Sequence, residues 1–264
     1  MRVKLTVSDS IATLRDQYFD EFQPKVAKLR MQSPEITAAM IDALAAELAQ
    51  FGFILRGGFT AAAGDGLPRL PDGRLAASVL LVGNAGGAMW RAFAAGRSAD
   101  SDGQNPLDDW TRTRMEPIAA KFGAMAVFPF GGPPWLPFQR WAVRADSVHP
   151  SPLGILIHPR YGLWHAYRAA LIFAEDLNLP TRAEDGASPC STCIAKPCLS
   201  TCPVGAFSAE GYDVPACAGH LRGPSGGDCR DGGCLARRAC PVGRDYAYPP
   251  DEGAFHIAAF LTRH

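Results

Sequence analysis

Apolar residues first form a regular pattern between residues 36 and 51, where they recur every three or four positions. The set comprises Ile36, Met40, Ala43, Leu44, Leu48 and Phe51. This spacing places them on one face of a helix. Ser33 and Pro34 suit the start of such a helix, and Gly52 suits its end. We therefore predict an amphipathic helix between these residues.

Uninterrupted apolar stretches farther along the chain predict buried strands. The stretches at 77–83 and 124–130 have strand length, and residues 154–173 are predicted to form two strands joined by a tight turn. Helices are predicted between the first two strands, at 88–96 and at 106–123. Helices that interleave with three or four strands predict a sheet-and-helix domain of the α+β class.

The segment "GGPPWLPFQRW", residues 131–141, is too rich in Pro and Gly for a regular element. We predict that it is a loop that presents Trp135, Phe138 and Trp141.

A change in composition marks a domain boundary near residue 180. From Leu179-Pro180 onward, Cys, Gly, Pro and Ser dominate and apolar periodicity is weak. We therefore predict two domains, 1–180 and 181–264.

The overall composition is that of a globular protein with balanced charge. The chain has 264 residues, of which 47% are hydrophobic, and it carries 26 basic and 26 acidic residues. A net charge of zero argues against a nucleic-acid partner bound through a broad basic surface. The longest apolar stretches are too short to cross a bilayer, so no membrane association is expected.

All eight cysteines lie in the last 75 residues of the chain, from Cys190 onward. The first group runs Cys190-x2-Cys193-x4-Cys198-x3-Cys202-Pro203, and the second runs Cys217-x11-Cys229-x4-Cys234-x5-Cys240-Pro241. Two groups of four, each closed by Cys-Pro, are close to the plan of bacterial two-cluster ferredoxins. The pattern predicts two four-iron, four-sulfur clusters.

The resemblance to the ferredoxin plan also implies how the cysteines are shared. In that plan the cysteine before the proline binds the cluster of the other group. One cluster is therefore expected on Cys190, Cys193, Cys198 and Cys240. The other is expected on Cys202, Cys217, Cys229 and Cys234. Gaps of four and five residues depart from the usual spacing, and Gly232-Gly233 is expected to absorb part of the difference.

Disulfides, zinc sites and structural free thiols compete with iron–sulfur clusters as roles for these cysteines. Disulfides need an oxidising compartment, and the N-terminus shows no apolar run of the signal-peptide type. Zinc sites usually pair two Cys-x2-Cys units, whereas only one occurs here. Structural free thiols do not usually cluster in this way. Clusters in a reducing cytoplasm are the favoured interpretation.

The stretch "HPRYGLWHAYRAAL", residues 158–171, resembles the "HPRFGGWFAIRG" stretch of the CblC-type cobalamin-processing chaperones. Weaker similarity extends over residues 45–175 and includes "LLVGNAGGAMWRAF" and "NPLDDW". The resemblance implies a nitroreductase-like fold for the first domain and weakly favours a homodimer. It also implies that the domain binds cobalamin, with flavin as the less favoured alternative.

The order of the cysteines is separately similar to that of epoxyqueuosine reductases. Those enzymes, like the reductive dehalogenases, join a nitroreductase-like cobalamin domain to two iron–sulfur clusters. Both resemblances therefore imply a corrinoid-binding domain beside a small ferredoxin-like domain that supplies electrons.

Seven residues are considered as candidates for the cofactor pocket. Trp135 and Phe138, with Trp141, are candidates for an apolar wall against the corrin, although ordinary core packing accounts for them equally well. His158, Arg160 and Trp164 belong to the resembling motif. Arg160 occupies the position that binds a thiol substrate in the CblC-type family, but a salt bridge would also account for it. His158 and His165 are candidate acids or cobalt-facing groups, with structural hydrogen bonding as the alternative.

The sequence thus predicts an iron–sulfur oxidoreductase that binds and reduces a corrinoid and takes electrons from a donor protein. No residue stands out as a catalytic acid or base. The alternatives are a non-catalytic electron carrier or cofactor chaperone, and an enzyme of the epoxyqueuosine-reductase type. Transfer RNA is not expected as a partner, because only 24 residues follow the last cysteine and the net charge is zero.

Overall fold

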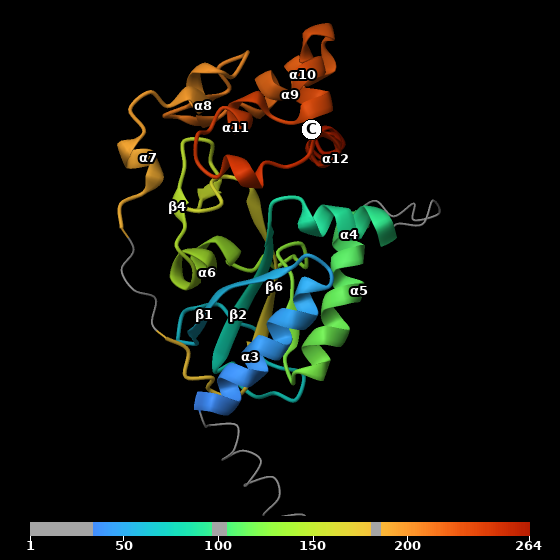
Figure 1. The fold of residues 1–264 in the computed structure, drawn as a ribbon, viewed down its shortest axis with the longest axis vertical. Helices are drawn as coiled ribbons and strands as arrows, with labels where there is room; N and C mark the ends of the chain where they lie inside the picture. The colour runs from blue at the N-terminus through green and yellow to red at the C-terminus, as the bar shows by residue number, and fades with distance from the viewer. Residues whose placement is uncertain (1–33, 97–104, 181–185) are drawn as a thin grey trace, which may run out of the picture.

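The centre of the molecule is a four-stranded antiparallel sheet (Figure 1). The structure is a computed structural model that describes residues 34–96, 105–180 and 186–264. In spatial order the strands are β1 (Ile54–Thr60), β2 (Ser78–Ala85), β6 (His165–Phe173) and β3 (Met125–Val127). β2 and β6 pair over their full length, from Ser78 opposite Phe173 to Ala85 opposite His165.

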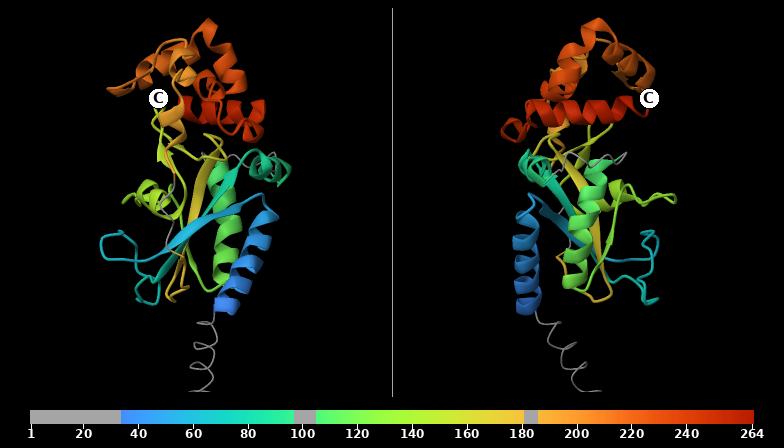
Figure 2. Two further views of the ribbon diagram at one scale, coloured as in Figure 1. Left: turned by 60° about the vertical axis from the view of Figure 1, so that its left-hand side comes forward. Right: turned by 90° about the vertical axis from the view of Figure 1, so that its right-hand side faces the viewer.

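Both faces of the sheet are covered, which explains why the central strands are apolar throughout. Successive strand residues point to opposite faces. Leu80 and Val82 of β2 therefore pack on one face, and Val79 and Leu81 pack on the other. On the first face they meet α3 (Pro34–Ala49), α4 (Ala88–Gly96) and α5 (Pro106–Lys121), as the two side views in Figure 2 show.

The second face is covered by α6 (Phe138–Ala145), so the prediction of a loop throughout 131–141 is wrong. Residues 131–137 are irregular, but Phe138, Trp141, Ala142 and Ala145 follow at helical spacing and are buried against β2. Proline does not prevent this helix, because Pro137 lies at its N-cap, where no intrahelical N–H is needed. Apolar packing therefore overrides the turn-like composition.

A short hairpin leads from α6 into β6. It consists of β4 (His149–Pro150) and β5 (Leu156–Ile157), followed by a turn closed by reciprocal hydrogen bonds between His158 and Gly162. Gly162 has a φ of 58°, a left-handed conformation that favours glycine. The predicted strand–turn–strand arrangement in 154–173 is confirmed.

The residues from 186 onward form a layer of short helices at one end of the sheet (Figure 1). The elements are α7 (Pro189–Thr192), α8 (Pro197–Ser200), β7 (Phe207–Ser208), β8 (Gly211–Tyr212), α9 (Val214–Arg222), η2 (Pro224–Gly226), α10 (Gly227–Gly232), α11 (Leu235–Arg238), η3 (Arg244–Tyr246) and α12 (Pro250–Leu261). The sequence did not predict α12, which returns to the sheet region and packs Phe255 against Trp90 and Phe93.

The mixed helix-and-strand class and most of the predicted elements are confirmed. The helices at 34–49, 88–96 and 106–121 and the strand at 78–85 lie within one or two residues of their predicted positions. The proposed N-cap Ser33, the N-terminal segment and residues 181–185 of the predicted second domain lie outside the described residues. In the described part of the chain, no helix is long and apolar enough to cross a membrane.

Candidate functional site

Four cysteines line a small cavity between the short helices and the β4–β5 hairpin. They are Cys190, Cys193, Cys198 and Cys240. We call this cavity the proximal cavity, because Pro152 and Ile157 of the sheet region form part of its wall. Its volume is about 20 Å³. Leu153, Ile157 and Leu163 join Cys198 and Cys240 in one apolar cluster, so this cavity is packed against the end of the sheet.

The other four cysteines line a second cavity of similar size. They are Cys202, Cys217, Cys229 and Cys234. We call it the distal cavity, because its walls come from the short helices and from Ile257 of α12. The two cavities therefore divide the eight cysteines into the same two sets of four that the ferredoxin plan implies.

Local backbone geometry places the thiols of the first group. Pro189 and Pro197 begin α7 and α8, so Cys190 and Cys198 each lie in a first helical turn. The side chain of Ser188 accepts a hydrogen bond from the backbone N–H of Cys190 and caps α7. Lys196 adopts a left-handed conformation with a φ of 38°. This turn accommodates the unusual four-residue gap before Cys198.

The thiols are partly or fully buried and none forms a disulfide. Burial raises the pKa of the Cys190, Cys198, Cys217 and Cys234 thiols. Within the described ranges, no three His, Cys, Asp or Glu side chains are arranged to hold a single metal ion. The thiols are instead placed around the walls of two cavities.

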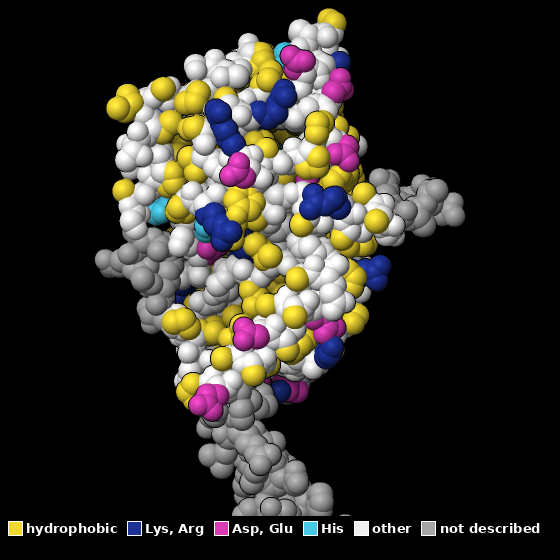
Figure 3. All heavy atoms as spheres, viewed as in Figure 1, with side chains coloured by type: hydrophobic (Ala, Val, Ile, Leu, Met, Phe, Trp, Pro, Cys, Tyr) yellow, Lys and Arg dark blue, Asp and Glu magenta, His cyan; other side chains and the backbone are white. Residues whose placement is uncertain are grey.

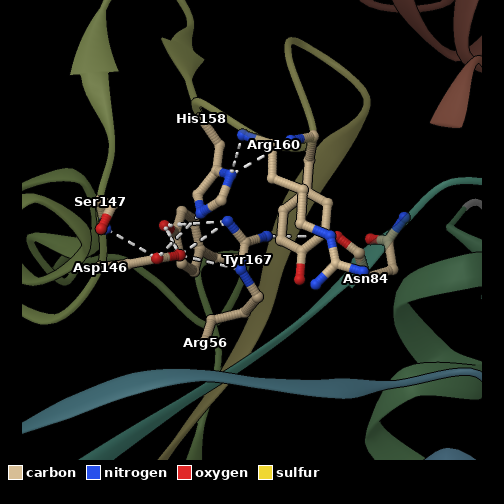
Figure 4. A network of polar contacts seen from close by, with 8 residues as sticks. Arg56, Asn84, Asp146, Ser147, His158, Arg160 and Tyr167 are labelled. Carbon is tan, nitrogen blue, oxygen red and sulfur yellow. Dashed lines mark hydrogen bonds and ion pairs between the residues drawn. The ribbon is translucent and has the colours of Figure 1, made fainter. Parts of the chain in front are cut away.

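A buried ion pair lies at the end of the sheet beside the hairpin (Figure 4). Arg56 of β1 is 2% exposed, and its Nη2 lies 2.7 Å from Oδ2 of Asp146. The Tyr167 hydroxyl donates to the same carboxylate oxygen at 2.8 Å. Arg56 also donates to the backbone carbonyl of Asn84 and lies over the Tyr161 and Tyr167 rings. The pair is therefore held by hydrogen bonds and ring contacts on several sides.

His158 is fixed by this network. Its Nδ1 accepts hydrogen bonds from the backbone N–H groups of Arg160 and Tyr161, at 2.9 and 3.1 Å. Its Nε2 lies 3.5 Å from Oδ1 of Asp146. Burial raises the pKa of Asp146, but the interactions with His158, Arg56 and Tyr167 outweigh burial and bring the pKa well below its usual range. A proton on Nε2 of His158 is therefore directed at a carboxylate, and the ring is held in one orientation.

His165 differs from His158 because neither of its ring nitrogens has a hydrogen-bond partner. The residue is 8% exposed and lies at the start of β6. Burial and the positive charge of Arg56 lower its pKa to about 3, so the ring is neutral at physiological pH. Trp164 Nε1 and Asn84 Oδ1 are also buried without partners. Unsatisfied polar groups of this kind are expected where an ordered water or a ligand binds.

A cavity of about 370 Å³ opens beside the network. Ser147, His158, Pro159 and Arg160 line it on the sheet side, and Gly186 and Ala187 line it on the cysteine side. Arg160 is exposed at this cavity, and its Nε donates to the Tyr246 hydroxyl at 2.8 Å. We call this the motif cavity. Its lining residues lie close in sequence to Cys190 and Ile157, which both line the proximal cavity.

The backbones of the two regions meet closely at this point. A Cβ atom on Gly162 would lie 1.9 Å from the Val242 carbonyl oxygen, and one on Gly243 would lie 2.3 Å from the carbonyl carbon of Tyr161. Arg237 of α11 donates to the Leu163 carbonyl and lies over the rings of Trp164 and Tyr248. The segment after Cys240 is therefore fixed directly against the turn that carries His158 and Arg160.

The structure brings only part of the predicted cofactor set together. His158 and Arg160 line one cavity, and Trp164 is buried nearby under Arg237. Trp135 is 68% exposed on the irregular segment before α6. Phe138 is buried against Trp141 in the core. These two aromatic residues do not form one wall with the motif residues.

Arg56, Asp146 and Tyr167 were not predicted from the sequence. The one signal for Arg56 was its position in an otherwise apolar strand, next to two glycines. Asp146 lies 90 residues away from it along the chain, so no local pattern connects the two.

No family model and no curated protein matches the chain. A crystal structure of an epoxyqueuosine reductase matches it at 16% identity, over 83% of this chain and 69% of that chain, with a TM-score of 0.50. The C. elegans B12-trafficking protein CblC matches at 15% identity, over 85% of this chain and 96% of that chain, with a TM-score of 0.48. An epoxyqueuosine reductase with a tRNA stem loop matches at 14% identity, over 82% and 71% of the two chains, with a TM-score of 0.46. The similarity that the sequence predicted is confirmed, and it is a similarity of fold.

Proposed function

We propose that this chain is an iron–sulfur oxidoreductase that binds and reduces a corrinoid. Residues 181–264 form a ferredoxin-like domain with two four-iron, four-sulfur clusters, and residues 1–180 form the corrinoid-binding domain. We place the protein in the cytoplasm, where eight thiols remain reduced and accessible to iron.

The observation that carries the proposal is the division of the cysteines between the proximal and distal cavities. Each cavity has four thiols, which is the ligand number of a four-iron cluster. The chemistry of the donor set fits such a cluster. Because the Cys190 and Cys234 thiols have raised pKa values, metal binding must displace their protons. Cluster assembly is therefore expected to be favoured by higher pH.

The arrangement of the cavities would set the order of the two clusters. The proximal cavity shares Ile157 with the hairpin that leads to His158, whereas the distal cavity lies among the short helices and α12. Clusters held by the two sets of cysteines would lie in this order, so the proximal one would supply electrons to the motif cavity and the distal one would receive them from the donor protein. Arg237 lies between Cys234 and Cys240 in sequence and fixes this route to the end of the sheet.

The residues at the end of the sheet fit a ligand with a polar rim. Ser147, His158 and Arg160 are the polar side chains that line the motif cavity. His165, Trp164 and Asn84 are not among its lining residues and have buried nitrogen or oxygen atoms without partners. A bound corrinoid supplies a cobalt centre that accepts single electrons. His158 and Asp146 hold the motif turn in place, while the neutral imidazole of His165 offers a hydrogen-bond donor and acceptor.

Two alternative functions predict different behaviour. A non-catalytic electron carrier would have the clusters but would not bind a corrinoid. An epoxyqueuosine-reductase-type enzyme would bind tRNA, as one of the matched structures does. On the face drawn in Figure 3, Lys and Arg side chains stand in separate small groups among apolar and acidic ones, so this face presents no broad basic surface.

The test is a titration of anaerobically purified protein with hydroxocobalamin. The protein is expected to contain about eight irons and about eight acid-labile sulfides per chain, and the corrin absorbance bands are expected to shift on binding. Arg160→Gln should weaken that binding, and Arg140→Gln, an exposed arginine on α6, is the matched control.

Each contrary result has a distinct meaning. About four irons, or zinc in their place, would show that one cavity holds no cluster. Eight irons with no shift of the corrin bands would contradict the corrinoid proposal and favour the electron carrier. Binding of tRNA at moderate salt would favour the epoxyqueuosine-reductase type.

A further inference from the structure

A separate cavity lies between α12 and the sheet region. Its volume is about 360 Å³, within the range of ~300–1,000 Å³ that is typical of small-molecule sites. Its walls come from Asn105 and the start of α5, from Arg168 of β6, and from α12 together with Arg263 and His264, which follow it. Figure 2 shows α12 lying across the end of the sheet, near α4 and α5. We call it the α12 cavity.

One side of the α12 cavity is apolar. Phe255, Ala259 and Phe260 of α12 line it together with Pro106 and Leu107 of α5. Of these, Phe255 also belongs to the core contacts with Trp90 and Phe93, so this wall is anchored to the sheet region. Such a wall suits the flat apolar body of a small organic molecule.

The side chains of the other wall carry a net positive charge. Arg168 and Arg263 line the cavity together with a single acidic side chain, that of Asp108. Asp108 already pairs with Arg168 at 2.7 Å. Burial and nearby arginines lower the pKa of His256 to about 4, so this lining residue is neutral at physiological pH. With Arg263 counted, these side chains have one more positive than negative charge.

Both arginines have N–H groups that remain available to donate hydrogen bonds to a ligand. Nη2 of Arg168 donates to the Leu107 carbonyl, to Asp108 and to Thr111, while its buried Nε has no partner. Nη2 of Arg263 donates to Oδ1 of Asn105 at 3.0 Å. A guanidinium has five N–H donors, so these contacts orient the groups without exhausting them. A planar guanidinium is well suited to carboxylate or phosphate oxygens.

We propose that the α12 cavity binds a small organic anion, with its carboxylate or phosphate on Arg168 and Arg263 and its apolar body against Phe255 and Phe260. This assigns a ligand class to a cavity separate from the cysteine-lined and motif cavities. The proposal needs neither cluster nor corrinoid, so it stands or fails independently of the proposed function.

The test uses the full chain and three probes: 2-naphthoate, its neutral near-isostere 2-naphthamide, and phenyl phosphate. Binding is followed by fluorescence titration and checked by calorimetry. The anions are expected to bind, and the amide is expected to bind roughly tenfold more weakly or worse, because charge-assisted hydrogen bonds are lost. Binding of phenyl phosphate but not naphthoate would identify a phosphate as the natural group, and the reverse would identify a carboxylate.

Two variants test the two walls. Arg263→Gln should weaken anion binding roughly tenfold and leave the amide unaffected. Ala259→Phe should fill the cavity and abolish binding of all probes. Arg112→Gln, an α5 arginine outside the cavity that pairs with Glu116, should bind like the unaltered protein. Equal binding of anion and amide, no binding of either anion, or unchanged binding in Ala259→Phe would overturn the proposal.

Discussion

Different interactions stabilise the sheet region and the cysteine-bearing region. In the sheet region, β2 is buried from Ser78 to Asn84, and two large apolar cores flank the sheet. In the cysteine-bearing region, α7, α8 and α11 have only four residues each. Helices that short are not stable on their own. The apolar cluster around Cys198 includes Leu153, Ile157 and Leu163 of the sheet region.

The two regions therefore depend on different interactions. Burial of apolar side chains fixes the sheet region, whereas thiols occupy much of the interior of the other region. If the thiols hold clusters, metal binding supplies folding free energy to that region alone. Four changes test this contrast, beginning with the largest expected effect.

The largest expected effect is the loss of one cluster. Cys198→Ser and Cys240→Ser should each reduce the iron content from about eight to about four per chain and should disturb the same cluster, because both residues line the proximal cavity. Cys217→Ser, in the distal cavity, is the matched comparison. Iron analysis and electron paramagnetic resonance measure the outcome.

Limited proteolysis of the same variants locates the damage. Cleavage should increase after residue 186 and leave 34–180 intact. Joint loss of both regions would show that the contrast is false. Spectra in which Cys198→Ser matches Cys217→Ser instead of Cys240→Ser would rule out the crossed pairing.

The next effect concerns the ion pair of the sheet region. Asp146→Asn leaves Arg56 buried without its partner, because the arginine side chain is 1% exposed. We expect a loss of about 3–5 kcal/mol in the free energy of unfolding, measured in urea. Asp72→Asn breaks an exposed pair with Arg74 and should cost far less, because solvent screens such a pair.

The same substitution has a pH signature. The pKa of Asp146 is depressed in the folded state, so its contribution to stability is present above the ordinary pKa and is lost as the pH falls. Asp146→Asn should therefore show a smaller loss of stability on acidification than the unaltered protein. An identical dependence of stability on acidification in both proteins would contradict the depressed pKa of Asp146.

A smaller effect is expected where the two regions meet. Gly162→Ala adds a methyl group that would lie 1.9 Å from the Val242 carbonyl oxygen. Gly154→Ala places the same group on a backbone with a similar φ, 73° against 58°, but in open space. Gly154→Ala should cost about 1 kcal/mol, and Gly162→Ala should cost more and expose the junction. Hydrogen exchange at Tyr161 and Val242 measures this, and equal costs would show that the junction is not rigid.

The last effect appears as a slope of the free energy of unfolding against pH. Glu252 of α12 is fully buried, and neither of its carboxylate oxygens has a hydrogen-bond partner. Burial raises its pKa to about 8. A raised folded pKa gives stability that is present below about 4.5 and is lost as the pH rises toward about 8.

Glu252→Gln should remove this slope, as measured by urea unfolding at several pH values. Glu116→Gln, on an exposed side chain, is the control and should keep it. A slope that persists in Glu252→Gln would show that another group takes up the proton.

Most of the fold could be predicted from the sequence, and the exceptions have physical causes. Leu44 and Leu48 repeat at helical spacing, and β2 is one apolar run. α6 was missed because Pro and Gly before it masked the spacing of Phe138, Trp141 and Ala145. α12 was missed because it follows a segment with little periodicity. In both cases burial against a distant element stabilises the helix.

Part of the candidate site could likewise be predicted from the sequence, and part could not. The spacing of the cysteines and the Cys-Pro endings predicted two groups of four thiols, because spacing is a local property of the chain, and the resemblance to the ferredoxin plan implied how the groups are shared. His158 and Arg160 also came from a local motif. Folding in three dimensions was needed to bring Asp146 to Arg56, to bury His165 without a partner and to close a basic cavity with α12 over Arg168. Charge pairing and burial depend on residues that are distant in sequence, and so no local pattern could determine them.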